Sequence, residues 1–341
     1  MSTPPSKGNS LAAYFGFGEI GDSPAEQKLQ DMKRRKTKRR LWTLLGLVAT
    51  WALFYWSLLL IEFRLSELVG QFDQFVEAMT EYFPPTTYFG IPFVDVGAYW
   101  SFIRAENLIL AVEGGQIVWG AMFITMGVAF AGTVLGLPLA LFFGVMSSER
   151  VIPYPFNFLF RGTMSLIRAI PGLVWFLILI PLAGVTPFTG ALAIMVDTTG
   201  YLGRLFTDEL EEIEDGPIEG IRSTGASSSQ IVTFGMLSQV FRQFIAWIAF
   251  DLEHNVRAAI GLGIIGAGGL GLELYVQRQT FNYTEMMACI ILIFLLAGSV
   301  ELLSQRVRSM LREDDNVEKS GILEAFINAP GNIIRSTMGR R

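Results

Sequence analysis

The sequence predicts an all-α, polytopic membrane protein with about six transmembrane helices. The 341 residues are 51% hydrophobic and only 17% charged, and their mean hydropathy is +0.44. A soluble chain of this size needs more charged side chains to cover its surface. The apolar residues also gather in stretches of about 20 residues, the length of a helix that crosses a bilayer. Finally, arginine and lysine are concentrated on one predicted side of these stretches.

The first predicted elements are a polar segment, residues 1–40, and a transmembrane helix over residues 41–61. A signal peptide would also have an apolar core. This core, however, lies late in the chain and has no small-residue cleavage pattern after it. The polar segment ends in the basic run Lys33-Arg34-Arg35-Lys36-Thr37-Lys38-Arg39-Arg40. Because basic flanks stay in the cytoplasm, residues 1–40 are predicted to be a cytoplasmic basic N-terminal segment.

Residues 62–115 are predicted to form an external segment of moderate polarity. Phe72, Phe75, Val76 and Met79 follow helical spacing, and Pro84-Pro85 interrupts the pattern. Such a stripe is typical of an interfacial helix that lies on the bilayer.

Further apolar stretches complete the predicted spans. They lie at about 116–146, 162–184, 187–207, 240–266 and 284–304. With 41–61 they make six spans, so the tail, residues 306–341, returns to the cytoplasm. The arginines of the tail and of the predicted inner loop agree with this topology: Arg150, Arg161, Arg306, Arg308, Arg312, Arg335, Arg340 and Arg341. We expect a multi-pass protein of the cell (plasma) membrane with both termini in the cytoplasm.

The residue inventory excludes several classes of enzyme. Cys289 is the one cysteine and His254 the one histidine, which excludes an intrachain disulfide, a zinc cage and a histidine-paired nucleophile. The sequence has no GxxxxGK[ST] loop, so it cannot hydrolyse ATP in the usual way. The formal net charge of -5 argues against a nucleic-acid partner. We predict a chain that is not an enzyme and binds no cofactor or metal itself.

A long polar loop, residues 208–239, lies on the predicted cytoplasmic side. It is predicted to form two short helices at an angle. Gly216 and Pro217 suit the start of the first helix, and Gly225 is free to adopt a positive φ between the two. The hydroxyls of residues 227–229 suit the N-cap of the second helix.

The spacing of residues in this loop resembles the EAA loop of type I ABC importer permeases. In that family the loop is a coupling helix that docks into a groove of the ATP-binding subunit. The resemblance implies that coupling to the ATPase depends on Glu219, Gly220, Gly225, Ala226 and Leu237.

Other runs are similar to phosphonate-importer permeases, and the likeness covers about residues 83–312. They are Phe83-Pro84-Pro85, Gly136-Leu137-Pro138-Leu139-Ala140, Arg168-Ala169-Ile170-Pro171, Gly200-Tyr201-Leu202-Gly203-Arg204-Leu205-Phe206, Thr224-Gly225-Ala226-Ser227, Asn255-Val256-Arg257-Ala258-Ala259 and Gly266-Ala267-Gly268-Gly269-Leu270-Gly271. There are departures: Ser238 stands in place of a proline and Gly235 in place of an aliphatic residue. Asp197 and Arg204 stand where that branch has histidine and lysine.

This resemblance implies a MetI-like core over residues 116–305 that imports phosphonate or a related phosphorus oxyanion by alternating access. The implied partners are two ATP-binding subunits, which would hold ATP and Mg, a second copy of this chain, an external substrate-binding protein and the lipid bilayer. One alternative is a permease for methionine or another small polar solute. Another is a gradient-driven secondary transporter, although no internal duplication is visible.

Charged and amide side chains inside the predicted spans are candidates for the translocation path, because ionised groups in a bilayer are costly unless paired or wetted. Glu253 and Arg257 are spaced for a structural ion pair on one helix face. The other interpretation is that Arg257 lines the path of an anion. The candidates are Arg257, Glu253, Asn255, Arg168, Arg204 and Asp197.

Three of these candidates leave further alternatives open. Arg168 and Arg204 fall toward the cytoplasmic ends of their predicted spans, where they would either snorkel or lead an anion out. Asp197 is expected to pair with one of the two. His254 is interpreted as a polar packing residue rather than a proton relay.

Glycines from Gly261 to Gly271 include a GxGxxG match, but it follows a predicted membrane helix rather than a strand, so we do not expect dinucleotide binding. Small residues here allow the backbone to pack closely or to unwind. The resemblance implies an external gate formed by Gly266, Gly268, Gly269 and Gly271, and a plain packing face is the alternative.

Overall fold

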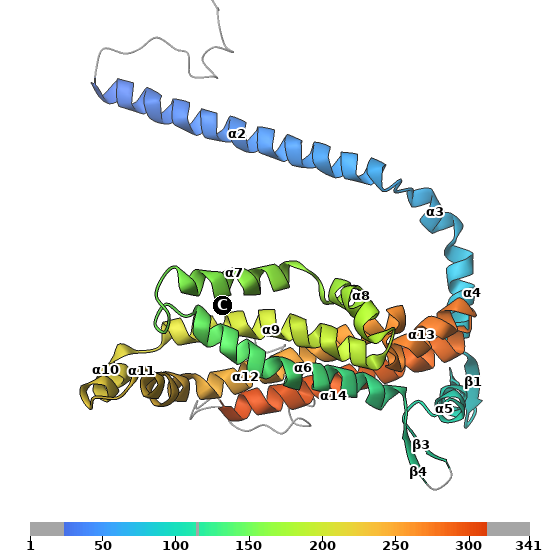
Figure 1. Ribbon diagram of the computed structural model, residues 1–341. Coiled ribbons are helices and arrows are strands. Elements are labelled where there is room, and N and C mark those ends of the chain that lie inside the picture. The colour runs from blue at the N-terminus through green and yellow to red at the C-terminus, as the bar shows by residue number, and fades with distance from the viewer. Residues whose placement is uncertain (1–23, 114–115, 312–341) are drawn as a thin grey trace, which may run out of the picture. The chain divides into compact units, whose positions relative to one another are not determined.

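The computed structural model describes residues 24–113 and 116–311 (Figure 1). The chain divides into two compact units, Met1–Glu77 and Ala78–Arg341, and each is considered by itself. Most of the described residues are helical, as the sequence predicts. The predicted cytoplasmic tail, residues 306–341, falls largely outside the described residues, and so do residues 1–23 of the N-terminal segment.

The first unit contains α2 (Pro24–Leu60), α3 (Leu65–Gly70) and the start of α4 (Phe72–Tyr82). The basic run at 33–40 belongs to the same helix as the apolar run, so this helix begins before residue 41. Its part from Met32 to Leu60 is long and apolar enough to cross a membrane. Trp42 and Trp51 are both 65% exposed within the chain, which suits side chains that face lipid.

The apolar stripe predicted at residues 72–79 does form a helix, α4. Phe72, Phe75 and Val76 are exposed on it, and the two phenylalanine rings lie 6.3 Å apart. Its position on the bilayer surface remains a prediction.

Residues 62–115, predicted to be external, include short strands within the mostly helical fold. Two antiparallel hairpins form in it: β1 (Pro85–Tyr88) with β2 (Ile91–Val94), and β3 (Leu110–Glu113) with β4 (Gln116–Trp119). In the first hairpin Phe89 and Gly90 both have positive φ, 52° and 81°, as a two-residue hairpin turn requires. Between the hairpins, α5 (Val96–Ala105) is capped by Asp95, whose carboxylate accepts from the Ala98 amide at 3.1 Å.

In the second unit, long helices form the bundle. These are α6 (Ala121–Ser147), α9 (Pro187–Glu212), α12 (Leu237–Leu262) and α14 (Tyr283–Leu311). Among the described residues of the whole chain, four helices qualify as membrane spans by length and composition, or five with a bent pair. The predicted count of six is therefore not confirmed. Helix α9 has the length of a span, but Asp197, Arg204 and Asp208 make it more polar.

Helices α6 and α9 approach closely because small residues line their contact. A methyl group at Gly136 would lie 2.7 Å from Thr198 Cγ2, and one at Gly132 would lie 2.5 Å from Ile194 Cγ2. Close backbone approach at small residues is the usual way for membrane helices to pack without a hydrophobic driving force. The stacked rings of Phe206 and Phe244 join α9 to α12 at a centroid distance of 4.0 Å.

The stretch predicted as one span at 162–184 is two helices, α7 (Phe156–Ala169) and α8 (Gly172–Ala183), bent by 93°. The break follows from Pro171, which has no amide hydrogen and holds the preceding Ile170 extended, with φ -102° and ψ 117°. The indole of Trp175 donates to the Ile167 carbonyl at 3.2 Å across the bend. The two helices together still qualify as a membrane span, but a bent one, because a proline lies between the two apolar segments.

The polar loop becomes α10 (Asp215–Ser223), followed by α11 (Ser228–Gln230) and the π-helical turn η1 (Ile231–Met236). Helix from Ser228 continues through α12 to Ala267, so the second predicted short helix is the start of a long one. A proline at 238 would have broken this helix, whereas Ser238 keeps its amide and donates its hydroxyl to the Phe234 carbonyl at 2.5 Å. The predicted boundaries 208–239 thus include the end of α9 and the start of the long helix that continues into α12.

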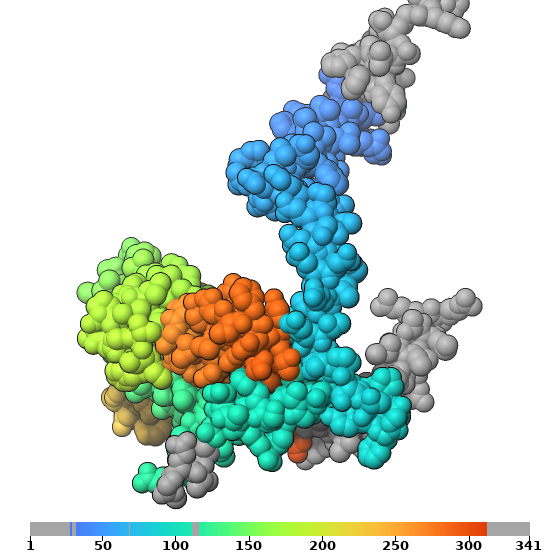
Figure 2. All heavy atoms as spheres, turned by 90° about the vertical axis from the view of Figure 1, so that its right-hand side faces the viewer, coloured from blue at the N-terminus to red at the C-terminus, as the bar shows by residue number. Residues whose placement is uncertain are grey.

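At the opposite end of the bundle, η2 (Gly263–Ala267) leads into α13 (Gly269–Gln279). Figure 2 shows α13, in orange, on the same face of the molecule as the hairpin segment, in teal. In Figure 1, α10 and α13 lie at opposite ends of the bundle, so we refer below to the α10 end and the α13 end.

Candidate functional site

A broken helix brings polar groups to the middle of the bundle. The N-terminus of α8 begins at Gly172, and a methyl group there would lie 3.8 Å from the Asp197 carboxylate. The first amides of a helix have no partner within it and carry a partial positive charge. The break therefore creates a helix end beside an acidic residue of α9.

Arg168 lies at this break rather than at the end of a span. A methyl group at Gly200, near the middle of α9, would lie 3.1 Å from Arg168 Cγ. The expected position toward the α10 end is thus corrected, because α7 starts at Phe156 and ends one residue after Arg168. The Arg168 side chain is exposed on the single chain. It interacts electrostatically with Asp197 and Tyr201.

On α9 and α12, Asp197, Tyr201 and His254 complete this group, which we call the mid-bundle site together with Arg168. The Tyr201 and His254 rings stack with centroids 5.9 Å apart and planes 14° apart. Asp197 interacts electrostatically with both His254 and Arg168. Sequence reasoning treated His254 as a packing residue, yet its side chain is exposed beside the other three.

Arg204 is not the partner of Asp197. It pairs with Asp208 one turn further along α9, with Arg204 Nε 3.1 Å from Asp208 Oδ2. The pair lies between the mid-bundle site and the α10 end, on the face of α9 that also carries Asp197 and Tyr201 by helical spacing. Of the two arginines considered from the sequence, Arg168 is therefore the one that interacts electrostatically with Asp197.

Asn255 lies in a separate, buried polar cluster. It is 1% exposed, and its Nδ2 lies 2.8 Å from each of three acceptors: Thr133 Oγ1, Thr198 Oγ1 and Asp251 Oδ2. The Thr198 hydroxyl donates to Asp251 Oδ2 at 2.9 Å. These bonds join α6, α9 and α12 inside the subunit. Asn255 therefore faces neighbouring helices, and its role in a path stays a prediction.

Arg257 forms the ion pair that the spacing predicted and a second one as well. Its guanidinium lies 2.9 Å from Glu253 Oε1 and 3.1 Å from Glu301 Oε2 on α14. Glu253 is buried and is also approached by Arg308 at 3.4 Å. Two arginines and two glutamates of α12 and α14 thus form a network in which opposite charges alternate, as expected of a structural network.

Arg257→Gln is expected to lower the amount of folded protein, because it weakens the compensation of a buried carboxylate. The double variant Arg257→Gln/Glu253→Gln is expected to restore both protein level and uptake. Protein recovered from membranes and solute uptake are measured together. Restored protein with abolished uptake would contradict this and keep Arg257 in the predicted path.

The predicted coupling residues surround a sharp turn at the α10 end. Glu219 and Gly220 are exposed on α10, and Gly225 has a φ of +81° with no atom within 4 Å of where a methyl group would lie. Ala226 and Leu237 are half-buried. After the turn, a capping box links residues 227 and 230, which confirms the predicted serine N-cap.

The α10 helix is held against the bundle by its apolar side. Ile218 is 7% exposed, and a methyl group at Gly235 would lie 3.3 Å from Ile221 Cδ1. Glu219 and Gly220 are left on the outer side. Gly235, which stands in place of an aliphatic residue of the similar family, therefore leaves room for the Ile221 side chain of α10.

The four predicted gate glycines lie in a segment that shows both the unwinding and the close packing expected from the sequence. Gly266, Gly268 and Gly269 have φ values of +111°, +87° and +71°, which interrupt the helix between α12 and α13. At Gly271 a methyl group would overlap the Ile260 carbonyl oxygen. The segment is thus both unwound and closely packed, and its role as a gate stays a prediction.

Gly271→Ala is expected to destabilise the fold by about 1–3 kcal/mol or more, because the added methyl group overlaps backbone. Gly261→Ala is the matched control, since nothing lies within 4 Å of a methyl group there. The midpoint temperature of unfolding in detergent is measured for both variants. An equal midpoint for the two variants would contradict the close packing.

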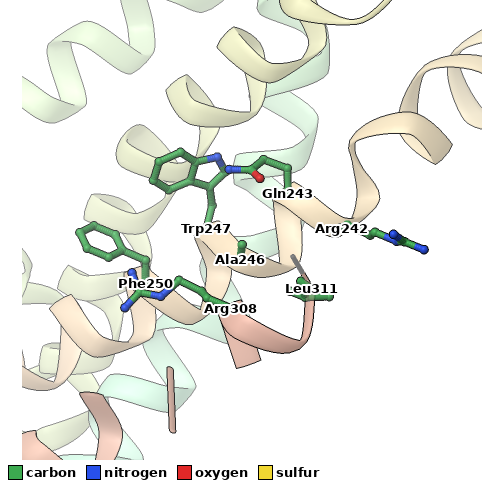
Figure 3. Close-up of a pocket in the computed structure, with 7 residues that line it drawn as sticks. All are labelled: Arg242, Gln243, Ala246, Trp247, Phe250, Arg308 and Leu311. Atoms are coloured by element: carbon green, nitrogen blue, oxygen red, sulfur yellow. The ribbon is translucent and has the colours of Figure 1, made fainter. Parts of the chain in front are cut away.

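A hollow of about 170 Å³ lies at the α10 end, between α12 and α14 (Figure 3). Its lining residues are Arg242, Gln243, Ala246, Trp247, Phe250, Arg308 and Leu311. None comes from α7, α8 or α9, so the hollow is separate from the mid-bundle site. Among the described residues, no group of three or more histidine, cysteine or acidic side chains is arranged to hold a metal.

Comparisons with known proteins agree with this architecture. Residues 136–309 match the family model described as binding-protein-dependent transport system inner membrane component. A Stutzerimonas stutzeri protein named as a phosphite transport system permease, HtxE, is 34% identical over 151 residues, which are 44% of this chain and 58% of that protein. The chain thus spans less than two thirds of that relative.

Two further comparisons cover their counterparts almost completely. An Escherichia coli K12 protein named as a cryptic phosphonate transport system permease, PhnE2, is 38% identical over 117 residues, which are 34% of this chain and 96% of that protein. An inward-facing structure of the MetNI methionine ABC transporter has a TM-score of 0.51 at 20% identity, covering 64% of this chain and 100% of the other. The latter shows a shared fold. The chain belongs to the family of binding-protein-dependent transport system inner membrane components.

Proposed function

We propose that this chain is the membrane-spanning permease subunit of an ABC importer that carries phosphonate or a related phosphorus oxyanion inward. The observation that carries this proposal is the mid-bundle site, where Arg168 and the N-terminus of α8 lie at the helix break. The relatives named for phosphite and phosphonate transport support the same class of solute.

The mid-bundle site has the donors that an oxyanion needs. A guanidinium offers paired N–H donors that match two oxygens of a phosphonate, and the first amides of a helix attract anions. Broken membrane helices bind anionic groups of transported solutes in this way. The Tyr201 hydroxyl and the His254 imidazole stand beside Arg168 as further donors.

Asp197 has a part in this proposal despite its negative charge. In the empty site it would balance the charge of Arg168 and His254, with which it interacts. A phosphorus oxyanion would take its place as the counter-ion during transport. Arg204, paired with Asp208, would receive the anion next on its way toward the α10 end. Arg257, Glu253 and Asn255 would then support the surrounding helices.

The remaining subunits supply what this chain lacks. Two ATP-binding subunits would dock on the exposed residues of α10, Glu219 and Gly220, and would bind and hydrolyse ATP with Mg. A second copy of the chain would complete a central path. An external binding protein would deliver the solute to the α13 end, where Gly266, Gly268, Gly269 and Gly271 would form the gate. Both termini would then be cytoplasmic, and the chain would act without being an enzyme or binding a cofactor.

The test is to purify the tagged chain from its native membrane in mild detergent and to quantify the proteins that come with it. A stoichiometric P-loop ATPase is expected. A co-purified binding protein is then screened against phosphonates, phosphite, phosphate and amino acids, with ATP-driven uptake in proteoliposomes as the second readout. Recovery of the chain alone from an intact preparation would contradict the ABC mechanism. Binding and uptake of methionine would contradict the proposed solute.

A further inference from the structure

At the α10 end, ion pairs and hydrogen bonds join the connection between α6 and α7 to the connection between α9 and α10. Arg161 on α7 pairs with Glu211 at the end of α9, and Arg161 Nε donates to the Ser147 carbonyl of α6 at 2.9 Å. Arg150, in the α6–α7 connection, donates from Nη2 to the Glu211 carbonyl at 3.1 Å. Its Nη1 pairs with Asp215, the first residue of α10. We call this group the corner network.

Three of the four charged side chains of the corner network are more protected than those of an ordinary surface ion pair, while Asp215 at the start of α10 is 73% exposed. The side chains of Arg150 and Arg161 are 29% and 23% exposed, and that of Glu211 is 29% exposed. Glu211 also accepts from the Glu149 amide at 3.2 Å, so its carboxylate has two donors. Paired and hydrogen-bonded charges of this kind hold their partners in one geometry better than single exposed pairs do.

Helix α7 connects this corner to the mid-bundle site. Arg161 and Arg168 are seven residues apart on it, which places both on the same side of the helix at a separation of about 10 Å along its axis. Beyond Arg168 the chain bends at Pro171. A displacement of α10 that is passed through the corner to α7 would therefore move Arg168 relative to α8 and Asp197.

Resting on the proposed function, we infer that Arg161 and Glu211 are positioning residues that transmit movement of the coupling helix α10 to Arg168 through α7. Arg150 connects Asp215, at the start of α10, to the end of α9 that carries Glu211. The network links the ATPase docking surface to the solute site without touching either partner. Its loss uncouples ATP hydrolysis from transport rather than abolishing hydrolysis.

The experiment uses proteoliposomes that hold the complete complex, with the external binding protein added. ATP hydrolysis and solute uptake are measured on the same samples for the wild type and for Arg161→Gln. We expect uptake to fall about tenfold while hydrolysis falls much less, so the ATP consumed per solute rises about fivefold or more; the tenfold loss of uptake corresponds to about 1.4 kcal/mol. Arg161→Lys keeps the charge but not the paired donors, so its ATP consumed per solute is expected to lie between the values of the wild type and of Arg161→Gln.

The charge-exchanged variant Arg161→Glu/Glu211→Arg rebuilds the pair with opposite polarity. It is expected to lower the ATP consumed per solute again, relative to Arg161→Glu alone. The matched control is Arg64→Gln, which removes an exposed arginine whose carboxylate partners are Glu62 and Glu67. It is expected to keep the wild-type ratio.

A purely structural role would reduce uptake and hydrolysis in proportion to the assembled complex and leave the ratio unchanged, which would overturn the inference. An unchanged ratio in Arg161→Gln with normal assembly would overturn it as well. Failure of the wild-type complex to drive ATP-dependent uptake would instead contradict the proposed function. The two failures are thus distinguishable.

Discussion

Replacing Arg168 with glutamine is expected to reduce ATP-driven uptake by about 10- to 100-fold, because a hydrogen bond to a charged group contributes about 1.5–3 kcal/mol. The loss arises because the mid-bundle site then has no permanent cation beside the α8 N-terminus and the Asp197 carboxylate. Uptake of the phosphorus oxyanion is measured in proteoliposomes over a range of solute concentrations.

Two further variants separate anion binding from a general effect on the fold. Arg168→Lys keeps the charge and is expected to retain part of the uptake. Arg306→Gln is the matched control, since Arg306 is exposed near the α10 end of α14. Assembly with the ATPase is expected to be normal in all three. Full uptake by Arg168→Gln would remove Arg168 from the solute site.

The second large effect is expected from Gly225→Val at the turn after α10. The backbone φ of +81° costs about 1–2 kcal/mol in a residue with a side chain, and a β-branched side chain fits this conformation least. The turn would open and displace α10, the helix that we propose docks on the ATPase. We expect uptake to fall about tenfold or more, with weaker stimulation of ATP hydrolysis.

Gly216→Val is the matched control for this change. Gly216 lies in α10, has no atom within 4 Å of where a methyl group would lie and has no positive φ. The effect at Gly225 is therefore one of backbone conformation, not of added volume. Equal uptake by Gly225→Val and the wild type would show that this turn does not position the coupling helix.

Local patterns predicted a large part of the architecture. The long apolar runs became helices, the α10 helix formed beside Gly225, and residues 227 and 230 form a capping box. Each of these depends on neighbours within a few residues, so spacing and residue type are enough. The order of the motifs in residues 83–312 also pointed to the family that the family model matches over 136–309.

The hairpins and the broken span show where local patterns were insufficient. By composition, residues 162–184 are one apolar stretch, whereas Pro171 divides them into two helices that are bent by 93°. The hairpin strands at 85–94 and 110–119 are only four residues long, and they lie within a region assigned by its polarity alone. The first hairpin depends on the positive φ of Phe89, and phenylalanine gives no turn signal in the sequence.

By itself, the sequence determined that the chain is a helical membrane protein with a turn at Gly225 and a Glu253–Arg257 pair. Only the tertiary structure decided that Arg168 lies level with Gly200, that His254 stacks on Tyr201 and that Arg161 meets Glu211. The physical reason is range: helical periodicity and turn chemistry act between near neighbours. Which charges meet across the bundle depends on helix bends and on small residues that set how closely α6, α7 and α9 pack.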